Sequence, residues 1–140
     1  MKVLRSLTKD LKKNLKKEFK VLKTLSHKNI VKVFDFIDAQ DALVLELCGI
    51  ICDDNVVIDI KDWARHCVKK QQVTDYQVIE QISSGLSYLH KIDVIHCDLK
   101  SSNCLVKGQM EAPIVKVADF GVAYFQTVTQ TETLNSQECY

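Results

Sequence analysis

The chain has 140 residues, of which 46% are hydrophobic and 26% charged, and its formal net charge is +1. This composition excludes an intrinsically disordered chain and predicts a globular domain, or part of one, with an apolar core. The apolar stretches are too short, and too often interrupted by charges, for a membrane span, and no secretory signal is recognisable. We therefore expect a cytoplasmic protein whose six cysteines are reduced thiols.

The positive charge is concentrated at the start of the chain. Residues 1–32 hold eleven Lys/Arg and two acidic residues, whereas residues 33–140 hold eight Lys/Arg and sixteen acidic residues. Such an asymmetry indicates either a solvated, lysine-rich helix face or a segment that attracts an anionic partner. Because the basic stretch carries no known docking motif for DNA or RNA, we expect no nucleic-acid partner.

The first part of the chain predicts a short strand, a helix and two further strands, at residues 1–5, 9–25, 30–37 and 42–47. The helix has one apolar face that is made of leucines, namely Leu11, Leu15, Leu22 and Leu25. A polar turn, 38–41, joins the last two strands. These elements predict a small sheet packed against one helix.

The second part predicts two helices followed by a hairpin. Asp59 can cap a short helix that runs to Val68, and Thr74 with Gln77 forms a capping box for a longer one. In the longer helix, Gly85 would allow a close approach to a neighbouring element. Two strands at 104–106 and 114–117 follow, around a turn near Gly108, and the polar tail 126–140 lacks apolar periodicity and is expected to be mobile.

Two polar loops carry the chemistry of the sequence. Residues 94–103 read VIHCDLKSSN, and residues 118–121 read ADFG. Each loop follows an apolar run, so that the loops present two carboxylates, an ammonium and an amide, from Asp98, Asp119, Lys100 and Asn103. Such a set can hold Mg²⁺ and phosphate and can take a proton from a hydroxyl group.

This pattern resembles the catalytic loop and the DFG motif of protein kinases, and the resemblance runs from Lys2 to about Tyr124. It implies an α+β protein-kinase-like fold, present in part. By this resemblance residues 1–47 are the end of the small-lobe sheet with its helix and hinge. Residues 48–125 are the first part of the helical large lobe, and 126–140 is a truncated activation segment.

The resemblance assigns a role to each polar residue of the two loops. Asp98 would be the catalytic base that accepts the proton of a substrate hydroxyl, and Lys100 would contact the transferred phosphate. Asn103 and Asp119 would hold Mg²⁺. The implied cofactors are ATP and Mg²⁺, and the implied partner is a protein substrate with a Ser or Thr hydroxyl.

The resemblance also implies a nucleotide site. Glu18 falls within the leucine face of the first helix, where a carboxylate needs a partner unless it reaches water at the edge. In kinases a Glu at this place pairs with a strand Lys that grips the nucleotide phosphates, and Lys2 would be that lysine. The backbone from Glu46 to Cys48 would be the hinge that binds adenine, with Leu105 beneath the ring.

A spine of residues would connect the two lobes in this interpretation: Leu22, Val33, His96 and Phe120. His96 would be structural and would pack under Phe120. Leu45 would occupy the gatekeeper position next to the hinge.

Lys100 and the sequence LKSSN at residues 99–103 favour a serine/threonine kinase similar to the tyrosine-kinase-like and receptor-like groups. Cys97 stands where most kinases have the Arg of HRD, so the resemblance is to non-RD kinases. Hydroxyl residues of the activation segment would then lack the Arg that normally binds their phosphates: Thr127, Thr129, Thr131, Thr133 and Ser136.

The sequence contains no Gly-rich phosphate loop and no APE motif. We therefore expect a fragment from the centre of a kinase domain that is inactive as an isolated chain. The alternative is a pseudokinase-like regulatory or binding module that acts on a partner kinase. The missing motifs favour this alternative, whereas the intact set of Lys2, Glu18, Asp98, Asn103 and Asp119 argues against it.

Overall fold

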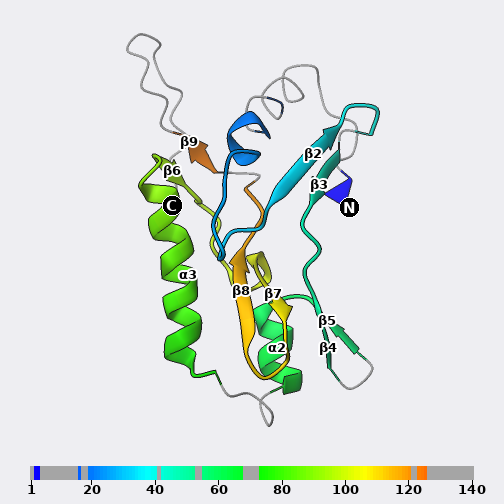
Figure 1. Cartoon of the computed structure of the whole chain (residues 1–140), viewed down its shortest axis with the longest axis vertical. Helices are drawn as coiled ribbons and strands as arrows, with labels where there is room; N and C mark the ends of the chain where they lie inside the picture. The colour runs from blue at the N-terminus through cyan, green and yellow to red at the C-terminus, as the bar shows by residue number, and fades with distance from the viewer. Residues whose placement is uncertain are drawn as a thin grey trace.

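The computed structural model describes residues 2–3, 16, 19–40, 42–52, 55–67, 73–120 and 123–125. Its first elements are β1 (Lys2–Val3), β2 (Val33–Ile37), β3 (Ala42–Leu45), β4 (Ile50–Cys52), β5 (Asn55–Val57) and helix α2 (Ile60–Cys67). Then follow α3 (Asp75–His90), β6 (Val94–Ile95), the 3-10 turn η1 (Ser101–Asn103), β7 (Cys104–Gly108), β8 (Pro113–Val117) and β9 (Tyr124–Phe125). The fold is thus α+β, with several small antiparallel sheets (Figure 1).

The three-stranded sheet in the region that the resemblance assigns to a small lobe has the strand order β1-β3-β2, and Lys2 in β1 pairs with Leu43 in β3. The predicted strand 30–37 begins only at Val33. Its first residues pair with β8 instead: Ile30 forms a bridge to Val117, and the Val31 N–H donates to the Val117 carbonyl at 2.9 Å. This pairing joins the small lobe to the rest of the molecule.

The predicted helix over residues 9–25 lies partly outside the described residues. Lys16 and residues 19–22 are helical, and the turn after them places Leu22 and Leu25 in the core, at 3% and 1% exposure. The inward-facing leucines predicted at these two positions are therefore confirmed. The predictions for Leu11, Leu15 and Glu18 fall on residues that the structure does not describe.

Helix α3 begins at the predicted capping box. The Thr74 hydroxyl accepts the Gln77 N–H at 3.3 Å, and the Gln77 side chain accepts the Thr74 N–H at 2.9 Å. The close approach expected at Gly85 is also present, because a Cβ there would lie 2.8 Å from the Asn29 carbonyl oxygen. Helix α3 packs along β8, as Figure 1 shows, and so carries the strand that leads to the ADFG loop.

A hairpin of β4 and β5 follows the predicted hinge, Glu46 to Cys48, in a segment where the sequence analysis predicted no regular structure. Ile50, Cys52 and Val57 face the core, whereas Ile51 and Val56 are 74% and 68% exposed. The alternation of apolar residues around the polar segment 53–55 was the signal that could have predicted it. The predicted hairpin of β7 and β8 is confirmed and runs from Cys104 to Val117.

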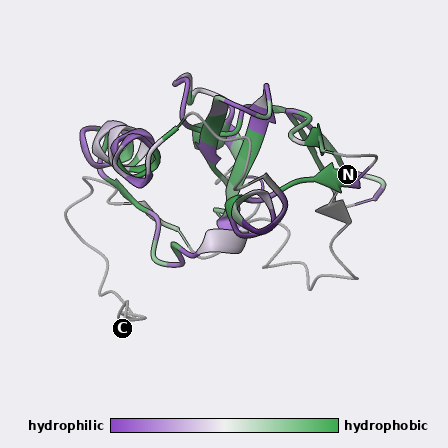
Figure 2. Ribbon diagram, turned by 90° about the horizontal axis from the view of Figure 1, so that it is seen from below, coloured by the Kyte–Doolittle hydropathy of each residue, from purple (hydrophilic) through white to green (hydrophobic). Residues whose placement is uncertain are grey.

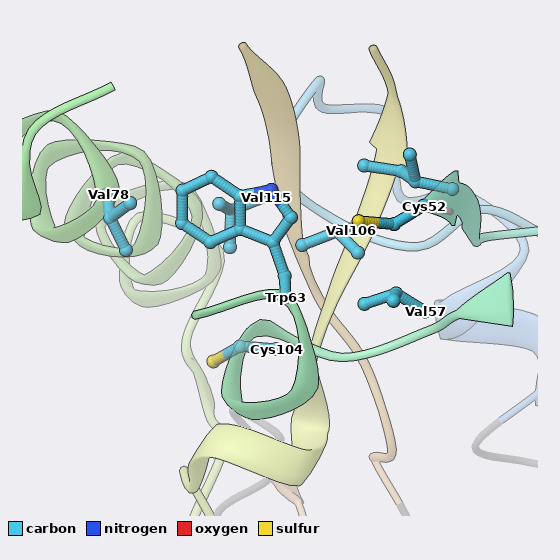
Figure 3. Packing of buried hydrophobic residues seen from close by; sticks show 8 residues of the cluster. Cys52, Val57, Trp63, Val78, Cys104, Val106 and Val115 are labelled. Atoms are coloured by element: carbon cyan, nitrogen blue, oxygen red, sulfur yellow. The ribbon is translucent and has the colours of Figure 1, made fainter. Parts of the chain in front are cut away.

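Two apolar clusters hold these elements together. In one, Trp63 extends from α2 toward β7 and β8 and lies near Val106 and Val115, while its indole N–H donates to the Met110 carbonyl at 3.0 Å (Figure 3). The other joins the small lobe to α3 and β8 through Leu22, Leu25, Ile30, Val33, Leu89, Val94, Val117 and Phe120. Figure 2 shows hydrophobic residues along the central strands and mixed hydropathy around α3, as expected for an amphipathic helix.

Among the residues that the structure describes, Cys48, Cys52 and Cys104 are free thiols. Cys97 is disulfide-bonded, so the expectation of a reduced thiol is wrong at this position. Within the part of the chain that the structure describes, no helix combines the length and the apolar character that crossing a bilayer requires.

Candidate active site

The first polar loop begins where β6 ends and runs into η1 and β7. His96 is 2% exposed, and its ring lies 5.3 Å from that of Phe120, centroid to centroid, as the sequence analysis predicted. The next residue, Cys97, has a φ of 59°, in the left-handed region that costs a non-glycine residue energy. The backbone therefore turns sharply between the buried His96 and the exposed side of the loop at Asp98.

Three of the predicted catalytic residues are in contact. The Lys100 ammonium donates to Asp98 Oδ2 at 2.6 Å. The Asn103 amide nitrogen donates to the same Oδ2 at 3.1 Å and to the Asp98 carbonyl at 2.9 Å. Asn103 is 5% exposed and lies at the end of η1, where its backbone N–H donates to the Lys100 carbonyl at 2.9 Å, so its side chain fixes the position of the Asp98 carboxylate.

These contacts set the charge state of the loop. The hydrogen bond from Lys100 lowers the pKa of the Asp98 carboxyl, and the same bond raises the pKa of Lys100. The nearby charge of Asp119 also raises the pKa of Lys100. At neutral pH the loop therefore presents an ionised carboxylate next to an ammonium group, with the Asp98 side chain 39% exposed and accessible.

The second polar loop is tied to the first. The Ala118 N–H donates to the Asn103 carbonyl at 2.8 Å. Nδ1 of His96 accepts the Asp98 N–H at 3.3 Å, so the neutral ring carries its proton on Nε2 and donates it to the Ala118 carbonyl at 2.9 Å. Asp119 follows directly, with a φ of 65°. The two loops thus form one hydrogen-bonded unit that brings Asp98, Asn103 and Asp119 to the same region.

The residues of the predicted nucleotide site are placed only in part. Lys2 lies in β1, the edge strand of the small-lobe sheet, and its side chain is outside the description, as is Glu18 altogether. Their predicted ion pair therefore stays a prediction. Leu105 lies in β7, and the segment with Glu46 and Cys48 connects β3 to β4.

The hinge contains a charge cluster that the sequence analysis missed. Glu46 Oε1 accepts from Lys107 at 2.7 Å, and Oε2 accepts from Lys116 at 3.0 Å and from the Lys32 N–H at 3.1 Å. Partial burial would raise the pKa of Glu46, but the bonds from Lys107, Lys32 and Lys116 outweigh it and lower that pKa to about 2. No local pattern reveals this cluster, because Lys107 lies 61 positions away along the chain.

A second missed network positions β8. The Asn29 amide nitrogen donates to the Val115 carbonyl at 2.8 Å and to Gln81 at 3.1 Å. Gln81 accepts the Val115 N–H at 3.0 Å and donates to the Pro113 carbonyl at 3.2 Å. Asn29 is completely buried, which is unusual for its type and shows that it is part of the scaffold.

The sequence of this chain is similar to sequences of known proteins. A family model described as "Protein kinase domain" matches residues 1–140. Serine/threonine-protein kinase atg1 of Dictyostelium discoideum is 32% identical over 116 residues, which cover 82% of this chain and 17% of that protein. Cysteine-rich receptor-like protein kinase 28 of Arabidopsis thaliana is 35% identical over 127 residues, or 84% of this chain and 17% of that protein.

A third relative, serine/threonine-protein kinase ATG1a of Arabidopsis thaliana, is 30% identical over 119 residues. The match covers 84% of this chain and 18% of that protein. The chain thus spans less than a fifth of the length of these relatives.

Proposed function

Because the chain belongs to the protein kinase domain family, we propose that it supplies the catalytic centre of an ATP-dependent protein serine/threonine kinase. The observation that carries the proposal is the hydrogen-bonded set of Asp98, Lys100 and Asn103, joined through Ala118 to Asp119. The names of the relatives support a Ser or Thr hydroxyl as the acceptor. A cytoplasmic location is part of the same proposal.

In this proposal Asp98 orients the substrate hydroxyl and accepts its proton. The carboxylate is ionised, accessible and held by Asn103, as a positioned base must be. Lys100, 2.6 Å from Asp98, would turn toward the transferred phosphoryl group and offset its charge. Catalysis would then rest on positioning and charge neutralisation.

The oxygen donors fit a magnesium ion. The nitrogen of the Asn103 amide is engaged by Asp98, so its oxygen is the atom that would face a metal, next to the Asp119 carboxylate. ATP with Mg²⁺ would supply the phosphoryl group and the neutralising charge. Lys2 and Glu18 would hold the phosphates of ATP, as in the sequence-based prediction.

The adenine ring would lie at the hinge, above Leu105. The Glu46 N–H donates to the Lys32 carbonyl at 2.8 Å, so the backbone group of Glu46 that remains for adenine is its carbonyl. Cys48 would supply the other backbone contact. The thiol of Cys48 is half-buried, and burial raises the pKa of Cys48. We therefore expect this thiol to stay protonated and uncharged where it lines the site.

We do not favour the alternative of a non-catalytic module on a partner kinase, because Asp98, Lys100 and Asn103 are held in direct contact. We still expect the 140 residues to be inactive in isolation, since their sequence lacks a Gly-rich loop and an APE motif. The test therefore uses the longest natural protein that contains these residues.

The experiment measures transfer of the γ-phosphoryl group of ATP to casein by that protein and by its Asp98→Asn variant. Removing a positioned base lowers rates by roughly 10²- to 10⁴-fold, and we expect a loss of that size. Asp93→Asn is the matched control, because Asp93 is exposed, has a φ of 57° and precedes the loop. Equal activity of Asp98→Asn and Asp93→Asn would refute the proposed role of Asp98.

A further inference from the structure

A basic pocket lies between the loop before β2 and strand β8, outside the catalytic loop. Its volume is about 240 Å³, far more than the roughly 10–15 Å³ that a single water molecule needs on the same measure. The loop before β2, the hinge and β8 line it, through Leu25, Ser26, His27, Lys28, Ile30, Lys32, Glu46 and Lys116. None of the proposed catalytic or metal-binding residues belongs to this lining, and Glu46 is the lining residue that also belongs to the proposed adenine site, through its backbone carbonyl.

The lining carries three lysines and one carboxylate. That carboxylate, Glu46, is already neutralised by Lys107, which reaches it at 2.7 Å and is not part of the lining. The second oxygen of Glu46 contacts Lys116 at 3.0 Å. The pocket therefore keeps an excess of positive charge although a glutamate lies in its wall.

Lys116 is the buried cation of the pocket, with a side chain that is 9% exposed. Its ammonium group has three N–H donors. Among the residues that the structure describes it has two acceptors, Glu46 Oε2 at 3.0 Å and the Ile30 carbonyl at 3.3 Å. An oxyanion in the pocket would give the third donor an acceptor.

His27 offers a neutral donor at the same place. Its Nδ1 accepts the Asn29 N–H at 3.1 Å, so the neutral ring carries its proton on Nε2. The ring stacks on Tyr88 at a centroid distance of 5.0 Å, which fixes its orientation. Burial lowers the pKa of His27, and the charges of Lys28, Lys116 and Lys91 lower it further, which reports a positive potential at the ring.

We propose that this pocket binds a phosphoryl group, either in a free phosphate or on a phosphorylated side chain. A phosphoryl group has three strong acceptor oxygens and a charge of about −2, and the pocket offers Lys28, Lys116 and the His27 Nε2–H as donors. A carboxylate would satisfy fewer of these donors. The site is independent of the proposed phosphotransfer and would exist in a protein without catalytic activity.

The pKa of His27 is the readout, because a bound anion would raise it. The full chain is titrated by NMR with inorganic phosphate, with sodium chloride keeping the ionic strength constant, and His66 and His90 serve as internal references. We expect the His27 pKa to rise in a saturable manner while the reference values stay unchanged. A His27 pKa that does not respond to phosphate would overturn the proposal.

A matched pair of exposed lysines tests where the anion binds. Lys28→Gln removes a pocket charge, and we expect it to weaken phosphate binding by about tenfold, the usual effect of losing one charged hydrogen bond. Lys61→Gln, on α2 and outside the pocket, should leave the affinity unchanged. Equal losses in the two variants would contradict a site at this pocket.

Repeating the titration with O-phosphoserine distinguishes the two sources of the group. Equal dissociation constants for the two probes would assign the site to the phosphoryl group alone. Tighter binding of O-phosphoserine would assign it to a phosphorylated side chain. Both results support the site, whereas binding of serine as tightly as O-phosphoserine would contradict it.

Discussion

Two carboxylates in this molecule hold lysines at nearly the same distance, yet their surroundings differ. Asp98 lies 2.6 Å from Lys100 with a side chain that is 39% exposed, and Glu46 lies 2.7 Å from Lys107 with a side chain that is 13% exposed. Glu46 also binds a second, buried lysine and a backbone N–H. The exposed pair of Asp98 and Lys100 is therefore accessible to a substrate. The buried cluster around Glu46 instead connects the segment between β3 and β4 to strands β7 and β8.

The largest effect on stability is expected at the buried carboxylate. Glu46→Gln removes the charge that compensates Lys116, and we expect the free energy of unfolding to fall by about 2–3 kcal/mol. Chemical denaturation of the variant and the unmodified protein measures this difference. Asp98→Asn is the control, since its carboxylate lies on the exposed side of the loop, and an equal loss of stability in both variants would contradict the comparison.

The pH dependence of stability separates the two carboxylates further. The pKa of Glu46 is lowered from 4.5 to about 2 in the folded protein. Its stabilising contribution is therefore present above about pH 5 and is lost as the pH falls toward 2. Denaturation midpoints measured across this range should fall more steeply for the unmodified protein than for Glu46→Gln, and parallel curves would show that Glu46 does not titrate in this way.

The smallest effect is expected where an ion pair is fully on the surface. Arg65 and Asp62 lie 3.6 Å apart on α2, with side chains that are 62% and 49% exposed. Solvent screens such a pair, so Arg65→Gln should change the free energy of unfolding by less than about 0.5 kcal/mol. The same denaturation experiment measures it, and a loss as large as that of Glu46→Gln would mean that burial is not what distinguishes the pairs.

The sequence predicted the parts of the fold that depend on local spacing. The packing of His96 on Phe120 was implied by the resemblance to protein kinases, whereas the capping box at Thr74 and the close approach at Gly85 each follow from a short motif. All three are present. The polar residues of the two loops were predicted for the same reason, and three of them are in direct contact.

What the sequence could not predict depends on pairs that are far apart in the chain. The Glu46 cluster brings residues from the hinge, β7 and β8 together, and neither the periodicity nor the spacing around Glu46 indicates which lysines it contacts. The late start of the strand predicted at 30–37 has the same cause, because Val31 bonds to Val117 rather than to the sheet. Tertiary pairing overrides the local pattern at both places.

The most direct test of the central claim measures phosphotransfer and unfolding on the same preparations of Asp98→Asn and Glu46→Gln, made in the longest natural protein that contains these residues. We predict that Asp98→Asn loses phosphotransfer by at least about 100-fold with little change in stability. Glu46→Gln should lose stability while its rate falls by less than about tenfold. If Asp98→Asn retains phosphotransfer, or if the two variants lose rate and stability together, the division between a chemical and a structural carboxylate is contradicted.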